Sequence, residues 1–226
     1  MTPPEHRGSA PGVHHVVTAG EPLSSARAVM IMVHGRGATA DDILGLRSHL
    51  PQDGVAFLAP QAAGSTWYPH GFLAPIASNE PWLSASLDGL GELLRTVAAA
   101  GLGADRTMLL GFSQGACLTV EFAARNAARL GGIVALTGGL IGPPGTPRDY
   151  PGAFDGTPVL LGSSDVDPHV PEWRVRETAE VLALMGARVT TRIYPGMGHS
   201  VNADELTFVG DMVAEVARAS GDRSRG

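Results

Sequence analysis

The chain has 226 residues, of which 44% are hydrophobic and 17% charged, with a formal net charge of −6 at pH 7. This size and composition predict a globular domain, and the negative charge argues against nucleic acid or an anionic membrane surface as its main partner. The single cysteine, Cys117, excludes an internal disulfide and fits a cytoplasmic location. No apolar run approaches the ~18 residues of a membrane span, and the polar start, Met1 to Gly12, does not resemble a signal peptide.

Strand and helix patterns alternate along the chain. Continuous apolar runs predict strands buried on both faces, and helical spacing of apolar residues predicts the helices between them. In chain order we predict an edge strand at His15–Thr18, a strand at Ala28–Val33, a helix at Asp41–His49, a strand at Val55–Ala59, a helix at Leu83–Ala100, a strand at Thr107–Leu110, a helix at Gln114–Ala128, strands at Gly132–Leu136 and Pro158–Leu161, a helix at Glu172–Met185, a strand at Val189–Tyr194 and a helix at Ala203–Ala217. This order predicts an α/β fold with a mostly parallel sheet, as one domain over residues 13–219 with flexible ends at 1–12 and 220–226.

Two long loops interrupt the alternation, at Gln61–Trp82 and Gly138–Gly156. Long loops in a compact domain are usually functional or disordered. The first loop carries the large apolar residues Trp67, Tyr68, Phe72, Leu73 and Trp82, which favours a functional role. Neither loop is long enough to form a separate cap domain, so we expect an open active site.

The segment Gly111-Phe112-Ser113-Gln114-Gly115 spells G-x-S-x-G between a predicted strand and a predicted helix. A serine on such a turn stands clear of the sheet with its hydroxyl exposed. Small residues are needed at Gly111 and Gly115 because a side chain there would crowd the strand against the helix. The spelling alone is weak, and a buried turn with an incidental serine is the alternative. The strand-turn-helix context favours Ser113 as a nucleophile.

A nucleophilic serine needs a base and an acid that orients the base. His199 is the candidate base, because it follows the last predicted strand on a glycine-flanked loop. Asp165 and Asp167 both follow a strand, on the same sheet edge as the serine turn. Asp167 is favoured because hydrolases with the chain order Ser…Asp…His often place the acid in a D-x-x-V pattern, which Asp167-Pro168-His169-Val170 fits. Asp165 would then be a loop aspartate that accepts backbone hydrogen bonds.

Three other histidines are predicted to have roles outside the triad. We expect His34 to be structural and His169 to be a loop or wall residue, while His70 is a candidate for a pocket lining; no cluster of residues predicts a metal site.

The backbone N–H groups of Gln114 and Arg36 are the candidate oxyanion donors. The side chain of Arg36 is either solvated or positioned to steer an acidic substrate group.

Together these motifs resemble the phospholipase/carboxylesterase family of α/β-hydrolases, which includes bacterial carboxylesterases and acyl-protein thioesterases. The resemblance spans roughly Ala28 to Val216 and rests on His34-Gly35-Arg36-Gly37, Gly111-Phe112-Ser113-Gln114-Gly115-Ala116, Asp167-Pro168-His169-Val170-Pro171 and Gly196-Met197-Gly198-His199-Ser200. It implies a twisted, mostly parallel sheet with helices on both faces and no cap domain. It also implies a triad of Ser113, Asp167 and His199, an oxyanion hole from the N–H groups of Arg36 and Gln114, and no cofactor.

The resemblance implies a serine hydrolase whose partner is a small-molecule ester, with thioesters as further substrates. The thioesterase members tend to carry an aliphatic residue in place of Arg36, and their loop differs from Trp67-Tyr68-Pro69, so we expect small carboxylic esters. We predict that the acyl group is walled by Trp67, Tyr68, Phe72 and Leu73. The alternatives are a ligand-binding α/β-hydrolase with little or no turnover and an acyl-protein thioesterase. A homodimer is a further option, since dimers are common among relatives.

Overall fold

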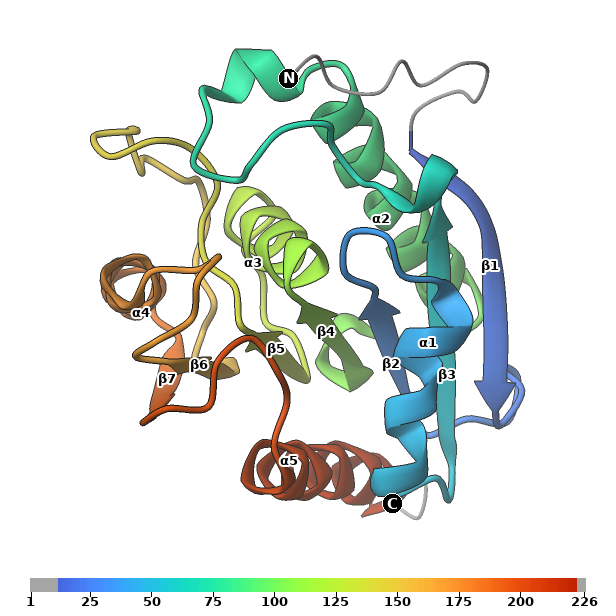
Figure 1. The fold of residues 1–226 in the computed structure, drawn as a ribbon. Coiled ribbons are helices and arrows are strands. Elements are labelled where there is room, and N and C mark those ends of the chain that lie inside the picture. Colours follow the sequence, from blue (N-terminus) through green and yellow to red (C-terminus); the bar gives the residue numbers. More distant parts are fainter. Residues whose placement is uncertain (1–11, 223–226) are drawn as a thin grey trace.

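The computed structural model describes residues 12–222, which fold around a seven-stranded sheet with helices on both faces (Figure 1). The strand order is β1-β3-β2-β4-β5-β6-β7, in which β1 is antiparallel to β3 and the other neighbours are parallel. The strands are β1 (Val13–Gly20), β2 (Ala28–Val33), β3 (Val55–Ala62), β4 (Thr107–Phe112), β5 (Gly132–Leu136), β6 (Pro158–Ser164) and β7 (Arg188–Tyr194). Each corresponds to a predicted strand.

The helices follow the predicted order with changes at their ends. They are α1 (Ala40–Leu44), α2 (Trp82–Ala99), α3 (Gln114–Arg125), α4 (Glu172–Leu184) and α5 (Ala203–Asp222). The predicted helix at Asp41–His49 is α1 followed by a 3₁₀ turn at Gly45–His49. Helix α3 ends before the predicted Ala128 because Asn126 leaves helical geometry and its amide caps the Phe122 carbonyl. The predicted flexible ends, 1–12 and 220–226, lie mostly outside the described residues.

Alternate residues of the central strands pack into two separate hydrophobic cores. Along β2, Val29, Ile31 and Val33 join the core on the side of α2, α3 and α4, whereas Ala28, Met30 and Met32 join the core with α1 and α5. All six residues of this strand are buried. A strand that is covered on both faces has no polar side, which explains the continuous apolar runs in the sequence.

The parallel strands place several loops at one edge of the sheet. Strands β2, β4, β5, β6 and β7 are consecutive neighbours, so the loops that follow β2, β4, β6 and β7 leave the same edge in order. These loops carry the candidate residues. Neither of the two long loops builds a separate cap over this edge (Figure 1). None of the helices in residues 12–222 has the length and apolar content needed to cross a membrane.

Candidate active site

Ser113 lies on the tight turn between β4 and α3. Its backbone has φ 54° and ψ −119°, an unusual conformation for a residue other than glycine. A Cβ added at Gly111 would come within 2.3 Å of the Gly115 carbonyl oxygen, and one added at Gly115 within 2.2 Å of the Val33 oxygen. The two glycines therefore allow β4, α3 and β2 to approach closely enough to hold the serine on this turn.

The structure joins Ser113, His199 and Asp167 in a chain of hydrogen bonds. His199 Nε2 lies 2.8 Å from Ser113 Oγ, and His199 Nδ1 lies 2.7 Å from Asp167 Oδ2. The Asp167 side chain is fully buried, and its Oδ1 accepts the N–H groups of His169 and Val170 at 2.8 and 3.0 Å. With Nδ1–H donating to the carboxylate, Nε2 is the nitrogen free to accept a proton from the serine hydroxyl.

Asp165 has a different role in the same loop. Its Oδ1 accepts the backbone N–H of Gly196 at 2.8 Å, and the neighbouring Ser164 Oγ accepts the N–H of Gly198 at 3.0 Å. These bonds fasten the loop that carries His199 to the end of β6. Asp165 is thus the loop aspartate with backbone partners that the sequence predicted.

The backbone N–H groups of Arg36 and Gln114 are available for a ligand. Neither donates a hydrogen bond to another described residue, whereas Gly37 N–H donates to Ser65 O and Ala38 N–H to Gly35 O. Arg36 and Gln114 both line the cavity beside Ser113. The turn after β2 lies close to the serine, because a Cβ at Gly35 would be 3.4 Å from Ser113 Cβ.

The side chain of Arg36 makes hydrogen bonds to the loop after β3 that the sequence did not predict. Its guanidinium donates to the carbonyl oxygens of Tyr68, Pro69 and His70 at 2.9, 3.0 and 2.7 Å. The side chain is therefore neither simply solvated nor free to steer a substrate. Burial lowers the pKa of Arg36 from its usual value, although the group stays charged at neutral pH. Its role in the structure is to hold the loop after β3 over the site.

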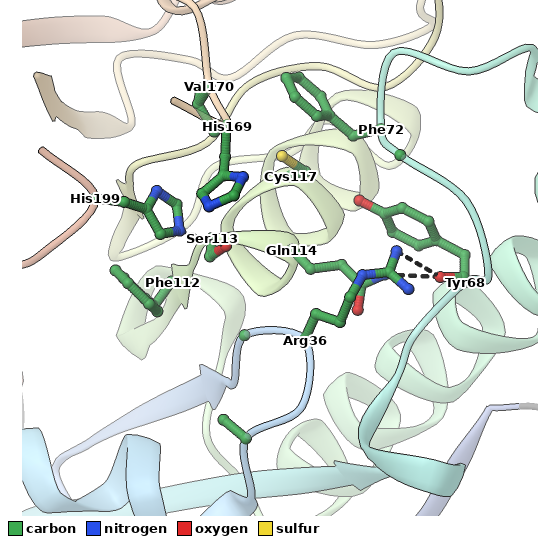
Figure 2. Close-up of a pocket in the computed structure, with 13 residues that line it drawn as sticks. Arg36, Tyr68, Phe72, Phe112, Ser113, Gln114, Cys117, His169, Val170 and His199 are labelled. Atoms are coloured by element: carbon green, nitrogen blue, oxygen red, sulfur yellow. Dashed lines mark hydrogen bonds between the residues drawn. The ribbon is translucent and has the colours of Figure 1, made fainter. Parts of the chain in front are cut away.

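A cavity of about 410 Å³ opens beside Ser113 (Figure 2). Of the predicted wall residues, Tyr68 and Phe72 line it, and Trp67 and Leu73 do not. Trp67 is fully buried; its indole N–H donates to the His34 carbonyl at 2.8 Å and its ring packs on the His34 ring. The prediction for Trp67 and Leu73 is corrected accordingly. The other side chains around Ser113 are those of Arg36, Ala38, Phe112, Gln114, Cys117, His169, Val170 and His199.

A second, more apolar cavity of about 230 Å³ adjoins the first and shares Gly35, Ala38 and Phe112 with it. Ile43 and Leu46 supply part of its wall from the helical segment after β2, and Val201 supplies another part from the loop after His199. The two cavities therefore meet beside the turn that carries Ser113.

Of the three other histidines considered, only His169 lines the cavity beside Ser113. His34 is buried, with Nδ1 donating to Gly35 O at 2.7 Å and Nε2 accepting Ala62 N–H at 3.1 Å, which confirms its structural role. Burial lowers the pKa of His34, so the ring is neutral. His169 lines the cavity and meets the His199 ring edge-on at 4.8 Å, as a wall residue would. His70 does not line it. The described residues contain no cluster of side chains that could hold a metal ion.

A buried polar network that the sequence does not predict connects the two long loops. Glu121, on α3, is 1% exposed, and its carboxylate accepts the Ile141 N–H at 3.0 Å and the Tyr150 hydroxyl at 3.1 Å. Gly142, which follows Ile141 in the chain, donates its N–H to the Phe72 carbonyl at 2.7 Å. The loop at 138–156 thereby fixes Phe72 at the cavity wall.

Comparisons with known proteins agree with this architecture. A family model described as Phospholipase/Carboxylesterase matches residues 14–216. The chain belongs to this family. It is therefore a hydrolase with the α/β-hydrolase fold, as its motifs predicted.

Relatives of this family with a known name or structure resemble the chain over most of its length. Acyl-protein thioesterase 1 of Gibberella zeae is 29% identical over 210 residues, which cover 82% of this chain and 89% of the relative. A solved phospholipase/carboxylesterase from Dyadobacter fermentans is 41% identical, with a TM-score of 0.87 and coverage of 91% and 99% of the two chains. The Bacillus cereus carboxylesterase, at 18% identity, TM-score 0.70 and coverage of 89% and 93%, supports the fold alone.

Proposed function

We propose that this protein hydrolyses small carboxylic esters, and thioesters of similar size, through an acyl-enzyme on Ser113. The observation that carries the proposal is the hydrogen-bonded series Ser113–His199–Asp167 at the mouth of a cavity. Membership of the phospholipase/carboxylesterase family and similarity to an acyl-protein thioesterase support it. We further propose a cytoplasmic location, which the single, buried and free thiol of Cys117 supports.

In the proposed reaction, Ser113 Oγ attacks the ester carbonyl while His199 Nε2 takes the hydroxyl proton. The carbonyl oxygen becomes an oxyanion that the N–H groups of Arg36 and Gln114 stabilise. His199 then returns the proton to the leaving alcohol or thiol, and Ser113 keeps the acyl group. A water molecule, activated by the same imidazole, releases the acid. Asp167 holds the imidazole in the required tautomer throughout, and no cofactor takes part.

Replacement of the nucleophile tests the proposal directly. We expect Ser113→Ala to abolish covalent labelling by a fluorophosphonate probe and to remove turnover of p-nitrophenyl butyrate, because no hydroxyl remains to form the acyl-enzyme. Ser84→Ala, which removes an exposed hydroxyl on α2, is the matched control and should keep both. Wild-type turnover in Ser113→Ala would refute the proposal, and labelling of the unmodified protein without turnover would favour a ligand-binding protein.

A further inference from the structure

The Tyr68 hydroxyl is a buried polar group without a proper partner. The residue is 0% exposed, yet it lines the cavity beside Ser113. Its oxygen has no hydrogen-bond partner of good geometry among the described residues, and the adjacent thiol of Cys117 is a weak acceptor at best. An unpaired buried hydroxyl is costly, so a hydroxyl in this state at a cavity wall suggests that a ligand completes it.

The protein holds this tyrosine in place from its backbone. The Tyr68 carbonyl accepts Gln114 Nε2 at 2.8 Å and Arg36 Nη2 at 2.9 Å. The Arg36 guanidinium also lies 6.0 Å from the centre of the Tyr68 ring. Burial raises the pKa of the phenol well above its usual value, so the group remains a neutral O–H donor. Tyr68 therefore holds a fixed, neutral donor beside the cavity that this residue lines.

This donor lies on the acyl side of the site. The leaving group has to take its proton from His199, and Figure 2 shows His199 and Tyr68 on opposite sides of Ser113. An acyl group that extends away from His199 therefore runs toward Tyr68. Cys117, which neighbours the phenol, is one helical turn beyond Ser113, since its N–H donates to the Ser113 carbonyl at 3.0 Å. One turn is about 5.4 Å, or roughly three to four bonds of an acyl chain.

On the basis of the proposed function, we infer that the preferred acyl group carries an uncharged oxygen, such as a ketone or an ether, and that the Tyr68 hydroxyl donates to it. The oxygen would lie about three to four bonds from the ester carbonyl, as judged from one helical turn. A plain alkyl chain of the same length would leave the buried hydroxyl unpaired, which makes Tyr68 a specificity-determining residue.

A matched substrate pair tests the inference. We would measure kcat/KM for p-nitrophenyl 4-oxopentanoate and p-nitrophenyl pentanoate with the wild type and Tyr68→Phe. The ratio of the two values should fall about three- to tenfold in Tyr68→Phe, the range expected for one neutral hydrogen bond. The different chemical reactivity of the two esters cancels in this comparison. Tyr194→Phe, whose hydroxyl donates to Asp204 at 2.7 Å, is the control and should leave the ratio unchanged.

Stability supplies a second readout. Tyr68→Phe should keep or raise the melting temperature, because it removes an unpaired buried hydroxyl, while Tyr194→Phe should lower it. An unchanged substrate ratio in Tyr68→Phe would overturn the inference, as would a clear loss of stability, which would reveal an internal partner for the hydroxyl.

A comparison of the wild type with Ser113→Ala distinguishes failure of the proposed function from failure of the inference about Tyr68. If the wild type hydrolyses neither ester faster than Ser113→Ala, the hydrolase proposal fails. The inference is then decided by calorimetric Kd values of both esters for Ser113→Ala with and without Tyr68→Phe. Tighter binding of the oxo ester that depends on the hydroxyl would support it, and equal ratios would overturn it.

Discussion

At the scale of single residues, the two aspartates after β6 show how position within one loop separates two roles. Asp167 accepts from the imidazole of His199, whereas Asp165 accepts from the backbone of Gly196. Both are carboxylates that receive N–H donors, so their chemistry is alike and only their partners differ. Substitution by asparagine keeps the size of each side chain and changes the charge and one of its two acceptor atoms.

We predict that Asp167→Asn lowers kcat by several orders of magnitude while the melting temperature stays close to that of the wild type. Asparagine can present its N–H₂ group to Nδ1, which favours the wrong tautomer, and the corresponding change costs about 10⁴ in kcat in serine proteases. In Asp165→Asn the amide oxygen can still accept the Gly196 N–H, so kcat should stay within about tenfold. Both variants are to be assayed side by side with p-nitrophenyl butyrate; the reverse order of activities would assign the imidazole partner to Asp165.

The sequence predicted some residues of the candidate site and missed others for a physical reason. Ser113, Asp167 and His199 stand in motifs whose local geometry is set by neighbouring glycines and by the ends of strands. The partners of Arg36 and the burial of Trp67 depend on where the loop after β3 comes to lie, which only the assembled fold determines. Glu121 was missed because a glutamate on a helix is usually exposed.

At the scale of elements, the turn at Ser113 depends on the close packing of β4, α3 and β2. A Cβ at Gly115 would lie 2.2 Å from the Val33 oxygen and 2.4 Å from the His34 oxygen. Both atoms belong to the backbone at the end of β2, which cannot move without shifting the strand or the turn after it. The helix would have to move instead, and Ser113 precedes its first residue.

We therefore expect Gly115→Ala to lower the free energy of unfolding by about 1–3 kcal/mol, the usual cost of overpacking, and to reduce kcat/KM as well. Gly45→Ala is the control, since no atom lies within 4 Å of the added Cβ and φ is −53°. It should be neutral or stabilise by up to about 1 kcal/mol. Urea unfolding midpoints together with ester hydrolysis rates would check both; equal stability of the two variants would contradict the packing argument.

The central strands could be predicted because they are apolar on both faces, but the ends of the elements could not. Strand β6 continues from Leu161 through Gly162, Ser163 and Ser164, which look like loop residues and yet pair with Arg192, Ile193 and Tyr194 of β7. The segment Asp41–His49 is helical, as its apolar spacing predicts. Apolar spacing does not distinguish an α-helix from the 3₁₀ turn that begins at Gly45.

At the scale of the whole molecule, the described chain forms one sheet, its covering helices and two anchored loops. Apart from these loops, no inserted segment in residues 12–222 covers the sheet edge where Ser113 lies. The cavity is consequently bounded by Tyr68 and Phe72 on the loop after β3 and by Val170 on the loop after β6. The adjoining apolar cavity adds about 230 Å³, and an acyl chain longer than these two spaces has to extend into water.

We predict that kcat/KM for p-nitrophenyl esters, measured from acetate to palmitate below the aggregation limit of each ester, falls beyond roughly six to eight acyl carbons. Each further CH₂ that remains in water gives up about 0.8 kcal/mol of binding that a deep tunnel would have supplied. An inserted cap domain could form such a tunnel, but the described chain has none. A specificity that peaks at palmitate would contradict this argument. It would instead favour the alternative prediction from the sequence, an acyl-protein thioesterase.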